Sequence, residues 1–325
     1  MTSPARRPQH LSKVKRPPLR KMGAAYMCVF MLVLFFKNSD AASLWVSEGL
    51  KLCASKLIPS LFPFMVVSSL MVSSGAGTAV FKIFEKPVRA VFGVGRECCA
   101  PIMLGWLCGF PVGARCASEL YRDGRINSSE YTRSLCISST PSPAFLIGTV
   151  GKGMLNDASL GVCLYALSIL SCIAVGLFMR LVSKSTPQTL SKPQSTQKRA
   201  GLAQSLTKAV TDSAVGMLYV CAFVVFFSAF LGAFEGALSF LHLSDTASAL
   251  LFSFFEMTSG ISRISKLSGN VLPLCALAAG WSGLSVHFQT AAMCTSKGTR
   301  FAPYILSHVA KAAICGTVAT IFCLL

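Results

Sequence analysis

Charged residues are scarce in this sequence, and acidic residues are the scarcest. Only 13% of its 325 residues are charged, with 12 Asp and Glu against 30 Lys and Arg, whereas an ordinary soluble domain has about 25%. Hydrophobic residues make up 53% of the chain, so too few polar side chains are left to cover a soluble protein. Long apolar stretches recur along its whole length, so the membrane is the expected solvent. The composition predicts an all-α polytopic membrane protein.

The motifs of enzymes and metal sites are also absent from the sequence. It has no HExxH, no GxSxG, no P-loop and no pair of carboxylates within one apolar stretch. The 14 cysteines include no CxxC pair and no Cys/His cluster at metal-ligand spacing. We interpret them as small apolar residues of membrane helices. We therefore expect no enzymatic activity, no cofactor and no metal.

The net charge of +18 lies between the apolar segments rather than on a soluble domain. This distribution is typical of the positive-inside rule and argues against nucleic acid as a partner. Residues 1–21 hold seven basic residues and no acid, which predicts a disordered cytoplasmic tail. The expected partners are membrane lipid and a small solute, and a second copy of the chain is a further candidate.

Seven apolar segments predict membrane spans, at about 20–37, 57–75, 134–152, 159–180, 213–234, 271–293 and 303–325. Residues 22–37 form the first transmembrane helix in this interpretation, and an Ala-Ala-Ser sequence at 41–43 leaves a cleaved signal peptide as the alternative. Two shorter pieces, 97–117 and 247–260, are interrupted by glycine, proline or polar residues and predict re-entrant segments.

The order of these segments predicts two inverted halves. Residues 57–180 run as span, re-entrant piece, span and span, and 213–325 repeat that order from the opposite side of the membrane. The basic, acid-poor stretch before 213 predicts a cytoplasmic linker over 181–212. Inverted repeats of this kind are the architecture of many secondary transporters, whose broken or re-entrant helices meet at a central site.

Four stretches interrupt the apolar pattern with residues that disfavour a continuous membrane helix. They are Gly105–Arg115, Ser138–Phe145, Glu256–Gly260 and Gly280–Gln289. Their order pairs the first with the third and the second with the fourth. A local likeness of Gly105-Trp106 to Gly280-Trp281 favours pairing the first with the fourth. That rival breaks the order of the elements, and we follow the order.

Broken helices in matching positions of two halves indicate a binding site near the membrane midplane. Helix N-termini there direct N–H groups and partial positive charge at a ligand, which favours an anion. The candidate substrate-binding residues are Gly109, Pro111, Gly113, Arg115, Ser139, Thr140, Ser142, Glu256, Thr258, Ser259, Ser282, Ser285, His287 and Gln289.

Three charged or titratable residues among these candidates have plain structural alternatives. Glu256 and His287 are ionisable groups inside the membrane, which are functional candidates by default. Glu256 could instead cap a helix, and His287 could be a hydrogen-bonded structural histidine. Arg115 could be an ordinary positive-inside residue.

These motifs resemble the sporulation integral membrane protein YlbJ family, whose fold is related to the nucleoside-recognition (Gate) domain. The pieces that carry the resemblance are Pro59–Phe64, Gly109–Gly113, Thr140–Phe145, Glu256–Gly260, Gly283–Gln289 and Arg300–Tyr304. They follow the family's order over about 57–305. Phe110 stands where the family has Tyr, and Trp281-Ser282 where it has Phe-Gly.

The resemblance implies a role in endospore formation, with export of dipicolinic acid from the mother cell towards the forespore. It also implies two Gate-like halves whose re-entrant hairpins face a central site, and a location in the outer forespore membrane. The alternatives are a transporter of nucleosides or other small metabolites, and a membrane scaffold of spore morphogenesis that transports nothing.

Overall fold

The computed structural model describes residues 19–74, 80–182, 201–238, 242–294 and 301–325, and all regular secondary structure in these ranges is helical. This confirms the all-α class. Most of the predicted basic tail, the centre of the predicted linker and Arg300 lie outside the described residues. The linker was predicted to extend to residue 212, but α10 already begins at Leu202. Ser205 and Ala209 are buried in its first turns, so packing extends this helix beyond its apolar segment.

The first half of the chain runs from α1 to α9. Its helices are α1 (Leu19–Lys37), α2 (Ser39–Leu52), the π-helix η1 (Cys53–Leu57), α3 (Ile58–Ser73), α5 (Lys82–Phe92), the 3-10 turn η2 (Arg96–Cys98), α6 (Cys99–Cys108), α7 (Phe110–Arg122), α8 (Ser128–Ser138), the π-helix η3 (Ala144–Lys152) and α9 (Ala158–Val182).

The second half runs from α10 to α15. Its helices are α10 (Leu202–Leu238), α11 (Asp245–Phe255), α12 (Met257–Ile264), α13 (Leu272–Trp281), α14 (Gly283–Met293) and α15 (Phe301–Leu324).

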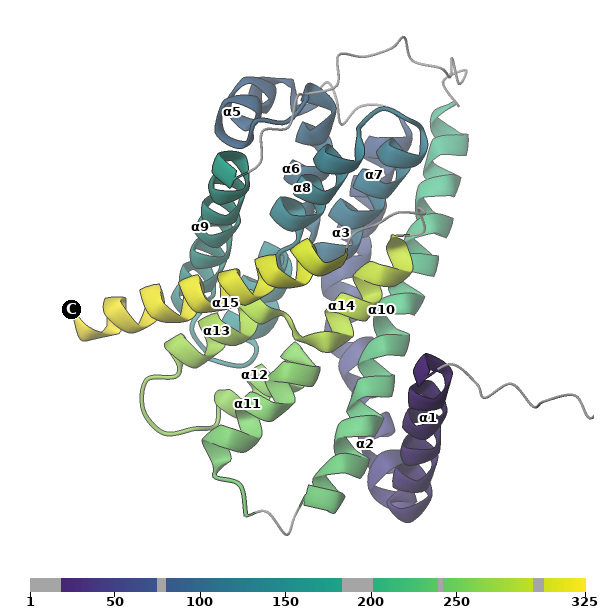
Figure 1. Ribbon diagram of the computed structural model, residues 1–325, viewed down its shortest axis with the longest axis vertical. Coiled ribbons are helices and arrows are strands. Elements are labelled where there is room, and N and C mark those ends of the chain that lie inside the picture. The colour runs from purple at the N-terminus through teal and green to yellow at the C-terminus, as the bar shows by residue number, and fades with distance from the viewer. Residues whose placement is uncertain (1–18, 75–79, 183–200, 239–241, 295–300) are drawn as a thin grey trace, which may run out of the picture.

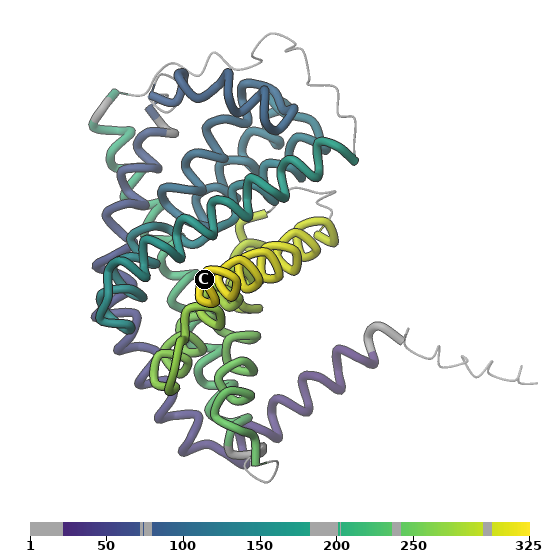
Figure 2. Tube along the Cα trace, turned by 90° about the vertical axis from the view of Figure 1, so that its left-hand side faces the viewer, coloured from purple at the N-terminus to yellow at the C-terminus, as the bar shows by residue number. Residues whose placement is uncertain are grey.

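The hairpins of the two halves occupy opposite ends of an elongated molecule, while α1 and α2 of the first half lie at the lower end beside α10 (Figure 1, Figure 2). In Figure 1, α5 to α8 lie at the top and α11 to α13 lie below them, and Figure 2 shows the same separation from the side. Helix α10 runs along most of the length and packs against α2 and α3. Helix α15 crosses the molecule obliquely and packs against α13, α9 and α8. Elements of both halves therefore meet at mid-height.

Four described helices are long and apolar enough to cross a membrane, which confirms a polytopic protein. They are Ser39–Met71, Ala158–Val182, Ala203–Glu235 and Phe301–Leu324, and a pair bent by 109°, Lys82–Phe92 with Arg96–Cys108, would make a fifth. The predicted span 57–75 is the second part of a longer helix. The predicted spans 134–152 and 271–293 are each broken in two, and α1 is apolar but shorter than the four.

Both predicted re-entrant pieces are helical hairpins. Helix α6 turns back into α7 at Gly109, whose φ of 91° suits glycine, and α7 then starts with a proline in its first turn. Helices α11 and α12 form the matching hairpin around Glu256. The breaks between α8 and η3 and between α13 and α14 do not fold their helices back on each other. The two hairpins thus correspond to the first and third interrupted stretches, and the two broken helices to the second and fourth. This agrees with pairing the stretches by their order in the sequence.

Candidate functional site

A cavity lies where the helix breaks of the two halves meet. The first half lines this central cavity with Gly109, Pro111 and Ser142, and the second half with Glu256, Thr258 and Gln289. Its remaining walls are mainly apolar and come from α3, α10 and the aromatic residues Phe110 and Phe145. Its volume of about 60 Å³ has room for a few water molecules. Six of the predicted site residues are therefore brought together.

The breaks also touch each other within each half. A Cβ atom added to Gly109 would lie 3.4 Å from the Ser142 backbone nitrogen, so the hairpin turn rests against the break after α8. A Cβ atom added to Gly283 would lie 2.9 Å from the Met257 nitrogen, so the second hairpin turn rests against the break between α13 and α14. The close approach explains the glycine at 283, whereas the positive φ explains the glycine at 109.

Glu256 is buried beside the cavity and caps a helix. Its carboxylate accepts hydrogen bonds from the backbone N–H groups of Thr258, at 2.9 Å, and Ser259, at 2.6 Å. The side chain is 2% exposed. The carboxylate thus neutralises part of the positive end of α12, and these two N–H groups are not free for a ligand. Glu256 therefore caps α12, as the structural alternative predicted, and it also lines the central cavity.

Two other helix starts face the cavity without a charged cap. Helix α7 begins at Phe110 with no side-chain cap, and its first residues line the cavity. At the start of η3, the Ser142 hydroxyl accepts a hydrogen bond from the Phe145 N–H at 3.2 Å. Partial positive charge at these two N-termini favours an electronegative group of a solute. The anion-attracting helix ends therefore belong to the first half.

His287 lies outside the central cavity, in a cluster of buried rings. Its Nδ1 is 3.3 Å from the Tyr304 hydroxyl, and its ring contacts Trp281 and His308 edge-on. Tyr304 in turn donates a hydrogen bond to Thr290 at 3.1 Å. The hydrogen-bonded structural alternative fits this histidine, since its ring packs between α14 and α15 and does not line the cavity.

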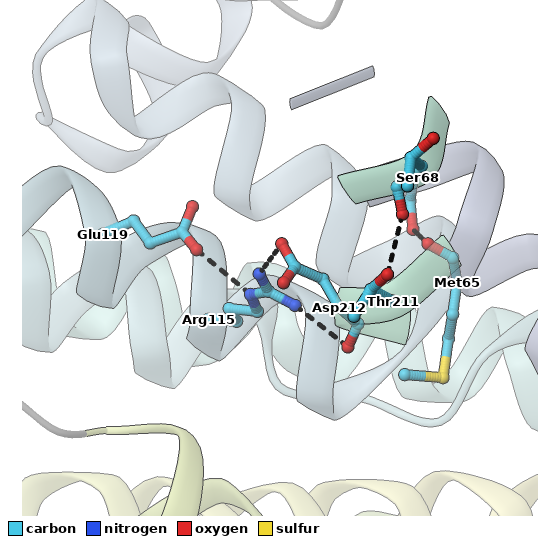
Figure 3. Close-up of polar contacts among 7 residues, drawn as sticks. Met65, Ser68, Arg115, Glu119, Thr211 and Asp212 are labelled. Carbon is cyan, nitrogen blue, oxygen red and sulfur yellow. Dashed lines mark hydrogen bonds and ion pairs between the residues drawn. The ribbon is translucent and has the colours of Figure 1, made fainter. Parts of the chain in front are cut away.

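Arg115 is also separate from the central cavity. Figure 3 shows its guanidinium between the carboxylates of Asp212 and Glu119, at 2.5 and 3.0 Å. This ion pair ties α7 to the beginning of α10. The three charges line a second cavity with Lys208, which we name the Arg115 cavity. Arg115 therefore lines the Arg115 cavity and not the central cavity predicted for it.

The remaining predicted residues surround the breaks without lining the central cavity. Gly113 packs tightly against Gly105 and Ser138, and Ser285 accepts a hydrogen bond from Gln289 at 3.1 Å. Ser139, Thr140 and Ser282 are buried in the broken backbone. Ser259 lies on the far side of α12, in a third cavity.

This third cavity, the Arg263 vestibule, is wide and polar. Its volume is about 820 Å³, and it is lined by charged residues of both signs together with Thr258, Ser259 and Ser262. Arg263 is paired with Glu235 at 2.8 Å and lies 3.6 Å from the centre of the Phe252 ring. The ion pair with Glu235 balances the charge of Arg263.

The three cavities form a row along α10, which lines the first with Asp212, the second with Val220 and the third with Ser228. The Arg115 cavity and the central cavity share Met65 and Pro111 in their walls. The central cavity and the Arg263 vestibule share Thr258. A hairpin turn therefore separates the centre from each neighbour: Pro111 belongs to the first hairpin and Thr258 to the second.

Sequence reasoning missed the buried polar residues of α15. Lys311 is 2% exposed, and its Nζ donates to the carbonyl oxygens of Cys136 and Ser139 at 2.7 and 2.6 Å. One turn earlier, His308 Nδ1 is 3.2 Å from the Gly280 carbonyl oxygen. The signal was present, because a lysine in the middle of the apolar segment 303–325 is an intramembrane charge.

Comparison with known proteins gives one relevant similarity. The chain is 27% identical to the sporulation integral membrane protein YlbJ of Bacillus subtilis (strain 168) over an alignment of 332 residues, which covers 91% of this chain and 80% of that protein. This similarity confirms the resemblance to the YlbJ family and agrees with an integral membrane protein. No protein-family model matches the chain. No solved structure matches it either.

Proposed function

We propose, with the resemblance to the sporulation integral membrane protein YlbJ family as the premise, that this protein transports a small anionic metabolite during endospore formation. The similarity supports a membrane role in sporulation. Dipicolinic acid is the proposed solute, and it moves from the mother cell towards the forespore across the outer forespore membrane. No catalytic step is part of this proposal.

The observation that carries the proposal is the row of three cavities. A scaffold has no need of a central cavity with Glu256 and Gln289 in its wall between two broken and re-entrant sets of helices. A transporter needs such a cavity, with an approach from each side and a barrier that moves. The two hairpin turns, at Gly109 and Glu256, supply those barriers.

The central cavity is too small for an aromatic dicarboxylate in the conformation described. About 60 Å³ holds a few waters, so the solute enters only when a hairpin moves away from the opposite half. Rocking of one repeat against the other is the usual form of alternating access in proteins of this architecture. In this proposal the conformation described is accordingly one without a bound solute.

A second candidate function is the transport of a nucleoside or another neutral metabolite with hydroxyl groups. The observation that favours it is the Glu256 carboxylate in the cavity wall, since a carboxylate accepts hydrogen bonds from hydroxyls and repels an anion. The helix starts of α7 and η3 favour the anion instead. The two candidates therefore differ in which half of the cavity holds the solute.

The test is a solute screen with the purified protein in liposomes. Uptake of radiolabelled dipicolinate, nucleosides and amino acids is measured at equal protein content, with empty liposomes as the control. We expect uptake of dipicolinate and competition by related aromatic dicarboxylates. Uptake of nucleosides alone would favour the second candidate, and uptake of no solute would favour a scaffold.

A further inference from the structure

Helix α15 covers the carboxyl ends of both broken helices. Helix α8 ends at Ser138, and Lys311 Nζ lies 2.7 Å from the Cys136 carbonyl oxygen and 2.6 Å from that of Ser139. Helix α13 ends at Trp281, where His308 Nδ1 approaches the Gly280 carbonyl oxygen at 3.2 Å. Figure 1 shows α15 crossing the region where these ends lie.

The end of a broken helix inside a membrane needs hydrogen-bond donors, and a positive group is favoured there. Its last carbonyl oxygens have no partner within the helix, and the helix dipole adds partial negative charge there. Water cannot satisfy them in a packed interior, where each unpaired polar group costs several kcal/mol. In secondary transporters such half-helix ends and unwound carbonyls hold the coupling ion, Na⁺ or H⁺.

Lys311 occupies this position with an ammonium group. The side chain is almost completely buried, and among the described residues no carboxylate forms an ion pair with it. Its two hydrogen-bond acceptors in the described part of the chain are both backbone carbonyls at the end of α8. A lysine ammonium is a compact point charge with several donors, so it matches a set of carbonyl oxygens as a small cation does.

We propose that the Lys311 ammonium is a tethered cation that fills the cation site at the end of α8. The carbonyl oxygens of Cys136 and Ser139 are suited to a small monovalent cation, and the Lys311 side chain takes the place of such an ion. Transport then needs no sodium or other dissolved cation as a coupling partner at this site. This inference rests on the proposed transport function, and it goes further in assigning how the negative helix end is balanced.

The first experiment compares cation requirements in liposomes. Wild-type dipicolinate uptake is measured in sodium buffer and in choline buffer at the same pH and ionic strength. Equal rates are expected. In Lys311→Ala, uptake in choline should fall by about tenfold or more, as for the loss of hydrogen bonds to a charged group, and ammonium or sodium should restore it. Lys152→Ala, which removes an exposed lysine at the end of η3, is the matched control and should behave as wild type.

A second experiment does not depend on transport. The thermal unfolding midpoint of each detergent-purified protein is followed as ammonium, sodium or choline chloride is added. Only Lys311→Ala should gain stability from the small cations, because only it has a vacant site, and binding to the folded state raises its stability. If wild type transports nothing, the proposed function is wrong. The unfolding measurement still tests whether Lys311 fills a cation site, because it does not depend on transport.

Three results would overturn the inference. One is a sodium requirement for uptake by wild type. Another is full activity of Lys311→Ala in choline. The third is a folded Lys311→Ala that gains neither activity nor thermal stability from any small cation. If Lys311→Ala cannot be isolated in folded form, the cation requirement of wild type alone decides.

Discussion

At the scale of single residues, Glu256 places a carboxylate in the wall of the central cavity. Its carboxylate is held by two backbone N–H groups of α12 and lines the same cavity as the uncapped start of α7. An anionic solute should therefore place its negative groups against α7 and η3, away from Glu256. A neutral solute with hydroxyl groups would use the carboxylate instead.

Glu256→Gln separates these cases. The amide oxygen can still accept a hydrogen bond from α12, but the charge is lost, so repulsion of an anion falls. We expect dipicolinate to bind the variant at least as tightly as wild type, measured by calorimetry on the purified proteins. If the carboxylate instead accepts a hydrogen bond from the solute, binding weakens by about tenfold to hundredfold, and the anion proposal is wrong.

Gln289 and His287 should have different effects although they are neighbours on α14. Gln289 lines the cavity, so Gln289→Ala should reduce transport by about tenfold if its amide contacts the solute, with little loss of stability. His287 packs among Trp281, Tyr304 and His308, so His287→Ala should lower the free energy of unfolding by about 1–3 kcal/mol. Transport at matched membrane abundance, together with thermal unfolding in detergent, compares the two. A transport defect in His287→Ala alone would reverse their assigned roles.

At the scale of elements, glycines allow the two helices of each hairpin to pack closely against each other. Gly113 on α7 packs against Gly105 on α6, and Gly260 on α12 packs against Ser253 on α11. A side chain at either position would push the two helices of a hairpin apart. Each hairpin tip lines two neighbouring cavities. The packing between the two helices of a hairpin therefore also sets the position of its tip between those cavities.

Gly260→Ala should therefore destabilise the protein. The added Cβ atom would lie 2.3 Å from the Ser253 Cα atom, so backbone must move, and overpacking of this kind costs about 1–3 kcal/mol. Gly148→Ala is the control, since a Cβ atom there has nothing within 4 Å. Unfolding of the two variants in detergent gives the comparison, and equal stability would show that α11 and α12 are loosely packed.

Element types were largely predictable from the sequence, but their lengths were not. Glycine and proline mark the break at Gly109-Phe-Pro, because a positive φ followed by a proline cannot continue a helix. Hydropathy marked 134–152 and 271–293 as spans because it averages over a broken helix. The contacts of Lys311 with Cys136 and Ser139 were not predictable, since they join residues far apart in the sequence.

At the scale of the whole molecule, two sets of broken helices meet around one cavity. The sequence predicted six of the residues that line it, because the residues that break the helices also form the site. It misplaced Arg115 and His287, because residue type and segment order do not give the direction of a side chain. The inverted relation of the two halves stays a prediction of the segment order and the positive-inside rule.

Reporter fusions test that relation. A reporter placed after Lys198 and another at Leu325 should lie on opposite sides of the membrane, because an odd number of crossings separates them in the inverted arrangement. A fusion at the N-terminus, predicted to be cytoplasmic, serves as the reference. Placement of both reporters on the same side would contradict two inverted halves.

The most direct test of the transport account blocks the central cavity. Dipicolinate uptake is measured in liposomes for wild type, Ser142→Trp, which would fill the cavity, and Ser43→Trp, which adds the same side chain at an exposed position of α2. At equal protein content and with unchanged elution from a sizing column, wild type and Ser43→Trp should transport dipicolinate and Ser142→Trp should not. Equal uptake by Ser142→Trp and wild type would contradict a solute path through the cavity between the helix breaks.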